Sequence, residues 1–119
     1  MSHFRKILVW QKSISLVTKI YKTTRTFPKE ETFGLTSQIR RSSVSIPSNI
    51  AEGSGRESNK DFLRFLYISL GSLFEMQTQL EIAKNIIYIN EEEFNHLYED
   101  SREIERMLAS LIKKIKDTI

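Results

Sequence analysis

A run of mostly apolar residues at alternating steps of four and three constrains the fold of this chain more than any other feature. Its members are Phe62, Leu66, Ser69, Leu73, Met76, Leu80, Ala83 and Ile87. Residues at this spacing lie on one face of an α-helix, so the run predicts one long helix packed against others along its whole length. The helix should begin at Ser58 or Asn59, with Asp61 near the positive end of the helix dipole.

A second apolar stripe lies beside the first on the same expected helix. Its members are Leu63, Tyr67, Leu70 and Phe74, with Phe65 and Ile68 beside them. Together the two stripes give more apolar surface than the core of one bundle can cover. A helix surrounded on all sides would explain them, but a four-helix bundle has no central position. The sequence therefore favours a subunit interface on this helix, at Phe65 or Phe74.

Two helices are expected before this one. The first ends near Pro28, because proline disfavours helix at the residue that precedes it. The second begins between Lys29 and Gly34 and ends at Gly53 and Gly55, since glycine is common just after a helix. The expected apolar residues are Ile7, Trp10, Ile14, Val17 and Tyr21 in the first helix and Leu35, Ile39, Ile46 and Ile50 in the second.

A fourth helix is expected after Asn90, with glutamates in its first turn and lysines in its last turns, where the helix dipole favours each charge. Its apolar stripe is Phe94, Leu97, Ser101, Ile104, Leu108, Leu111 and Ile115. The links between the expected helices are short, so neighbours should run antiparallel. We therefore expect one domain over residues 1–119, an all-α, up-down antiparallel four-helix bundle.

Residues 34–57 depart from ordinary helix preferences. Pro47 removes a backbone hydrogen bond inside the expected second helix. We expect a bent but continuous helix, with the Ser43 hydroxyl bonding the freed carbonyl. Asn49 and Glu52 are expected to hydrogen-bond across to another helix, since buried polar groups need partners.

Two further positions favour contacts between helices. Gly71, flanked by Ser69 and Ser72, would allow a close approach in the middle of the third helix. Glu75 and Gln79 lie one turn apart, which is typical of a polar network across a bundle.

Composition argues against several classes of protein. The chain has no cysteine, and its two histidines lie far apart, so neither a disulfide nor a metal site is expected. No glycine loop suited to phosphate is present, and no cofactor is expected. No signal-peptide pattern and no apolar run near the ~18 residues of a membrane span are found, so we expect a cytoplasmic protein without membrane contact. An enzyme is not expected; the alternative is a small hydrolase using Ser45 or Glu52.

Positive charge is concentrated in the first half of the chain. Residues 1–56 contain 10 basic and 3 acidic residues, a net charge of +7, while residues 57–119 contain 8 basic and 12 acidic residues, a net charge of −4. One interpretation is a basic surface on the first two helices that binds a polyanion. The other is that the two halves neutralise each other across the bundle.

Arg40 and Arg41 are candidate nucleic-acid-binding residues, with Lys12, Lys19 and Lys22 of the first helix as further candidates. Guanidinium groups beside serine hydroxyls suit phosphate oxygens. The alternative is an intersubunit salt bridge from either arginine to Glu52, Glu57 or Glu75. Aromatic residues near the first-helix cations could stack on bases, although core packing explains them better.

Seven separated motifs follow one another along nearly the whole chain. The longest is Ser45-Ile46-Pro47-Ser48-Asn49-Ile50-Ala51-Glu52-Gly53, and the others span residues 9–11, 27–31, 34–41, 62–66, 71–75 and 107–112. In sequence and order these motifs resemble the four-helix bundle family of 23S ribosomal RNA intervening-sequence proteins.

The resemblance implies an up-down four-helix bundle that assembles into a homopentameric ring and has no enzymatic activity. The related accessory proteins of diversity-generating retroelements look similar, and they are understood as basic barrels that bind nucleic acid and a reverse transcriptase. We therefore expect a non-enzymatic oligomer that binds RNA or DNA through its first two helices. A scaffold that recognises an acidic protein partner is the alternative.

Overall fold

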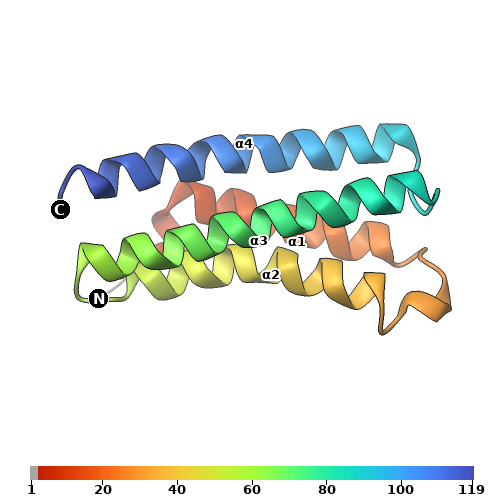
Figure 1. Cartoon of the computed structure of the whole chain (residues 1–119), viewed down its shortest axis with the longest axis horizontal. Helices are drawn as coiled ribbons and strands as arrows, with labels where there is room; N and C mark the ends of the chain where they lie inside the picture. The colour runs from red at the N-terminus through yellow and green to blue at the C-terminus, as the bar shows by residue number, and fades with distance from the viewer. Residues whose placement is uncertain (1–2) are drawn as a thin grey trace.

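Four long helices and two short 3₁₀ segments make up the computed structural model, which describes residues 3–119 (Figure 1). They are η1 (Phe4–Lys6), α1 (Leu8–Thr24), η2 (Lys29–Glu31), α2 (Leu35–Ser54), α3 (Asn59–Asn85) and α4 (Glu91–Lys116). Successive long helices run in opposite directions and form a bundle of 45 × 23 × 20 Å (Figure 1). The predicted all-α fold with four helices is confirmed for the described residues. The predicted domain also includes residues 1 and 2, which lie outside them.

Helices α2 and α3 pack closely at Gly53. A Cβ atom on Gly53 would lie 2.6 Å from the Cβ of Phe65, a side chain that is only 8% exposed, so a larger residue would push the helices apart. At Gly71, in contrast, a Cβ atom would meet nothing within 4 Å. The prediction that Gly71 allows a close approach is therefore wrong within this chain, because α3 turns the opposite side, with buried Ser69, toward its neighbours.

Polar side chains also join α2 to α3. The Ser72 hydroxyl donates a hydrogen bond to the Ser45 hydroxyl at 2.9 Å, and the buried Ser42 hydroxyl donates to Oε1 of Gln79 at 2.6 Å. The predicted cross-bundle network thus exists at Gln79. Glu75 makes no hydrogen bond or ion pair with the described residues and lies exposed one turn earlier.

Helix α2 continues through the buried Pro47, as predicted. The Ser43 hydroxyl donates to the carbonyl of Arg40 at 2.8 Å, so its predicted bond to the carbonyl freed by Pro47 is wrong. A serine hydroxyl reaches the carbonyl three residues back more easily than its own, which explains the difference.

Asn49 and Glu52 do not hydrogen-bond to another helix, contrary to the prediction. The amide nitrogen Nδ2 of Asn49 donates to the backbone carbonyl of Ser45 at 2.8 Å and to its hydroxyl at 2.9 Å. Glu52 is exposed and pairs with Arg56 of the segment after α2 at 3.3 Å. Both side chains find partners four residues away, so the buried-polar argument did not apply to them.

The buried face of α1 differs from the predicted stripe. It consists of Val9, Ser13, Leu16, Ile20 and Thr24. Ser13 and Thr24 can be buried because their hydroxyls donate to the carbonyls four residues back, at 2.7 and 2.8 Å. Of the residues in the predicted stripe, Ile14 and Tyr21 are exposed. The predicted buried face of α1 was wrong because Ser13 and Thr24 were treated as polar residues that would stay exposed.

Most of the predicted stripe of α3 is buried, but its last member is not. The helix ends at Asn85, and Ile87 lies in the turn beyond it, exposed and with a positive φ of 65°. Of the two predicted caps for α3, Ser58 or Asn59, the Ser58 side chain is the one that caps the helix. Helix α4 begins after Asn90, as predicted, and Asn90 caps it through a reciprocal pair of bonds with Glu93.

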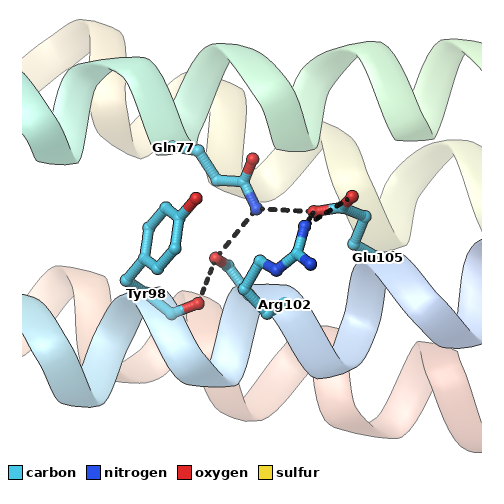
Figure 2. A network of polar contacts seen from close by, with 5 residues as sticks. Gln77, Tyr98, Arg102 and Glu105 are labelled. Carbon is cyan, nitrogen blue, oxygen red and sulfur yellow. Dashed lines mark hydrogen bonds and ion pairs between the residues drawn. The ribbon is translucent and has the colours of Figure 1, made fainter.

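A polar network ties the middle of α3 to α4 (Figure 2). Nε2 of Gln77 lies 3.1 Å from both the Ser101 hydroxyl and Oε1 of Glu105 and donates to each. Glu105 also accepts from Arg102, which therefore balances its charge at the rim of the core.

Over the described residues, no helix has the length and apolar character that crossing a membrane requires.

Candidate functional site

A basic groove opens at the end of the bundle where α1 leads through η2 into α2, the right-hand end in Figure 1. Its volume is about 550 Å³, within the range of roughly 300–1,000 Å³ typical of small-ligand sites. The lining residues are Tyr21, Thr24, Arg25, Phe27, Pro28, Lys29, Thr32, Phe33, Thr36, Ser37, Arg40 and Arg41. Four of these are basic and none is acidic. We call this the α1–α2 groove.

Arg40 forms one wall of the α1–α2 groove and holds α2 against the end of α1. Its Nε donates to the Thr24 hydroxyl at 2.8 Å, and its Nη2 donates to the carbonyl of Tyr21 at 3.4 Å. The guanidinium also lies over the Tyr21 ring, 4.6 Å from its centroid. These contacts fix the position of Arg40 and cover one face of the tyrosine.

Arg25, Lys29 and Arg41 differ from Arg40 because their charges are not paired. All three side chains are exposed, and within residues 3–119 none of them makes a hydrogen bond or an ion pair. Three unpaired cations around one concave surface attract anions more strongly than the same cations would on a flat surface.

The Glu31 carboxylate joins the turn before α2 to the start of that helix and to Tyr88. Its Oε1 accepts from the backbone N–H of Leu35 at 3.0 Å, and its Oε2 accepts from the Tyr88 hydroxyl at 2.8 Å. The Leu35 bond, followed by the Tyr88 bond, lowers the pKa of Glu31 below its ordinary value of 4.5. The hydrogen bond from the Tyr88 hydroxyl to the Glu31 carboxylate raises the pKa of Tyr88 above its ordinary value of 10.0. Glu31 thus caps α2 in place of Gly34, which has no side chain to do so.

The lysines of α1 that were candidates for nucleic-acid binding face a different surface. Lys12 lies 3.4 Å from Glu103, and Lys19 lies 2.7 Å from Asp100, both on α4. Lys22 is exposed and forms no ion pair with the described residues. The structure therefore brings Arg40 and Arg41 together but separates them from Lys12 and Lys19.

A second, polar groove of about 370 Å³ lies between α2 and α3. Its lining residues are Gln38, Arg41, Ser42, Ser45 and Glu75. Arg41 therefore lines both grooves, and Arg41 and Glu75 form no hydrogen bond or ion pair with each other. Among residues 3–119, no three His, Asp or Glu side chains gather closely enough to hold a metal ion.

Sequence reasoning missed Arg25, Lys29 and Phe33 as members of the candidate site. A signal was present, since residues 21–33 combine three basic residues with Tyr21, Phe27 and Phe33. Alternating basic and aromatic residues are typical of surfaces that bind nucleic acid. Tyr21 was expected in the apolar stripe of the first helix and residues 27–31 among the family motifs, so no binding role was predicted for Arg25, Lys29 or Phe33.

Comparisons with known proteins add a family assignment. The sequence model of the 23S rRNA-intervening sequence protein family matches residues 5–110. A similar solved structure is that of a protein of unknown function from the S23 ribosomal protein family of Bacteroides thetaiotaomicron, which is 32% identical. The match covers 89% of this chain and 96% of that chain, with a TM-score of 0.82. Among curated proteins, no sequence matches significantly. Neither description names an enzymatic activity.

Proposed function

This chain belongs to the 23S rRNA-intervening sequence protein family, and we propose that it is a non-enzymatic module that binds RNA or DNA through the α1–α2 groove. The observation that carries the proposal is the set of unpaired cations in that groove, Arg25, Lys29 and Arg41, with no acidic residue in the lining. Phosphate oxygens satisfy such cations, and the Ser37 hydroxyl in the same lining adds a donor. An acidic protein partner is the rival ligand.

The experiment is a salt titration of binding to labelled RNA and DNA by fluorescence anisotropy. The variant combines Lys29→Ala with Arg41→Ala. Each phosphate contact that is lost should reduce the slope of log affinity against log salt by roughly one, so a reduction of about one to two is expected for each bundle engaged. Weakening should be nearly uniform across sequences, because phosphates carry no sequence information.

The matched control combines Lys113→Ala with Lys114→Ala, which removes the same charge from exposed positions near the C-terminus, at the opposite end of the bundle (Figure 1). This control should keep the wild-type slope within error. Equal losses for both double variants would mean that net charge, not the groove, governs binding. Binding to acidic proteins, with none to nucleic acid, would favour the scaffold alternative.

We further propose that the bundle assembles through the outer face of α3. Tyr67, Ile68, Phe74 and Ile82 are all exposed there, and Gly71 lies on the same face. Contiguous exposed apolar surface of this kind marks interfaces more often than free surface. The resemblance to the family sets the expected number of subunits at five.

Light scattering tests this assembly, with an expected mass about five times the chain mass of 14.0 kDa. Phe74, 46% exposed, and Phe65, 8% exposed, provide a matched pair on one helix. Phe74→Asp should give folded monomers, whereas Phe65→Asp should reduce helical content because it places a charge against α2. A monomeric wild-type protein at micromolar concentration would contradict the assembly.

A further inference from the structure

The side chain of Phe33 is anomalous in its position. It is 95% exposed, more than any other large apolar side chain described, and it lines the α1–α2 groove. Folding normally removes a phenylalanine side chain from water, because burying its large apolar surface is favourable. The turn before α2 gives no evident reason for an exception. The exposure therefore calls for a local structural reason or for a ligand.

A role in capping α2 does not explain why the Phe33 side chain is exposed. The residue directly precedes the N-cap Gly34, a position from which an apolar side chain often packs against the fourth residue of the helix. In α2 that residue is Gln38, which is polar and exposed. The contact is absent, so Phe33 does not stabilise the start of the helix in this way.

The other two aromatic rings of the groove are already engaged. The Phe27 ring is buried and packs against Tyr88 with 5.3 Å between centroids. One face of Tyr21 is covered by the Arg40 guanidinium. Phe33 makes no ring or cation contact within the described residues, so both faces of its ring are free.

From this arrangement we infer that the ligand of the α1–α2 groove is an unpaired nucleic-acid strand, with one base stacked on Phe33 and its phosphates at Arg25, Lys29 and Arg41. The inference rests on the proposed function and narrows it. Stacking requires a base whose face is free, and in a duplex the neighbouring base pairs cover both faces. Proteins that bind single strands combine a basic groove with such aromatic platforms.

The first experiment compares a labelled oligothymidine of about 12 nucleotides with a duplex of equal length, using wild-type protein and the Phe33→Ala variant. The wild type should prefer the single strand. Phe33→Ala should weaken single-strand binding by roughly tenfold and change duplex binding by less than about twofold. Leu8→Ala is the matched control, because Leu8 is another exposed apolar residue and lies at the start of α1, away from the groove; it should bind as the wild type does.

A second measurement reports stacking directly. Trp10 is the only tryptophan, so the combination of Trp10→Phe and Phe33→Trp places a single fluorophore in the groove. Its emission should be quenched by the single strand and much less by the duplex. Phe33→Trp should also restore the affinity that Phe33→Ala loses.

The outcomes separate this inference from the proposed function. If Lys29→Ala with Arg41→Ala weakens binding but Phe33→Ala does not, the groove binds phosphates and the stacking inference fails alone. The stacking inference also fails alone if the wild type binds single strand and duplex equally well and Phe33→Ala weakens both to the same extent. If wild-type protein binds neither, the proposed function fails first. A changed mass of Phe33→Ala in light scattering would make Phe33 a subunit contact and overturn the inference.

Discussion

Helix α1 carries positive charge toward α4, and its C-cap residue Arg25 carries positive charge toward α2. The two sides differ in the groups that surround these charges. Toward α4, Lys12 and Lys19 lie opposite Glu103 and Asp100 at 3.4 and 2.7 Å. Toward α2, Arg25 lies in a groove whose lining contains no carboxylate. Charge alone therefore does not make a binding surface; the cations must also lack partners within the fold.

The uneven charge of the sequence has two consequences in the fold. A basic first half and an acidic second half could neutralise each other or leave a basic surface. Both occur, in different places. Charges neutralise each other where α1 packs against α4, and basic residues stay unpaired at the turn between α1 and α2. The ion pairs are partly exposed, so they stabilise the fold little, and their main effect is to occupy the lysines.

The largest expected effect comes from placing an acid in the α1–α2 groove, which makes it resemble the α1–α4 side. Ser37 lines the groove at the third position of α2, where glutamate interacts favourably with the helix dipole. Ser37→Glu should therefore leave the melting temperature unchanged or raise it, and weaken nucleic-acid binding by roughly tenfold at low salt. Ser37→Gln is the control of similar size. Wild-type affinity in Ser37→Glu would place the binding surface elsewhere.

A smaller effect, of opposite sign, is expected when the paired lysines are released. Asp100→Asn combined with Glu103→Gln leaves Lys19 and Lys12 without their partners at nearly unchanged shape. Affinity for nucleic acid should rise by about threefold, and the salt dependence should become steeper, because two more cations can displace counterions. Anisotropy titrations measure both. A fall in affinity would show that these carboxylates support the binding surface.

Removing the paired lysines themselves should change little. Lys12→Ala combined with Lys19→Ala should keep the affinity within about twofold, since their charge is already neutralised locally. Denaturant unfolding should show a loss below about 1 kcal/mol, because both pairs are substantially exposed. A loss of affinity equal to that of Lys29→Ala with Arg41→Ala would remove the distinction between the two sides.

The smallest effect concerns Glu31, whose carboxylate holds the turn before α2 through Leu35 and Tyr88. Because its pKa is lowered in the fold, its contribution to stability is present above the ordinary value of 4.5 and disappears as the pH falls through the folded-state pKa. Glu31→Gln should thus melt at a lower temperature than wild type near neutral pH, and the difference should shrink as the pH falls below 4.5 and through the folded-state pKa. Circular dichroism melts over a pH series check this. A difference that does not change with pH would assign the effect to packing instead of charge.

The two phenylalanines of α3 illustrate how far pattern reading extends. The spacing of the α3 stripe predicted most of the buried face, and Phe65 and Phe74 were both assigned to the additional apolar surface. Phe65 is buried because Gly53 lets α2 come close, whereas Phe74 stays exposed. Which phenylalanine is buried depends on how α3 is rotated against α2. That rotation depends on Gly53, which lies 12 positions before Phe65 and in another helix.

The sequence by itself determined the helices of this protein, their caps and their order, because these depend on interactions between residues a few positions apart. It also determined the charge asymmetry between the two halves. Only the tertiary structure decided which cations are paired, since Lys12 and Lys19 meet carboxylates more than eighty residues away. It likewise placed Arg25, Lys29 and Phe33 beside Arg41, because the turn between α1 and α2 folds them around one groove.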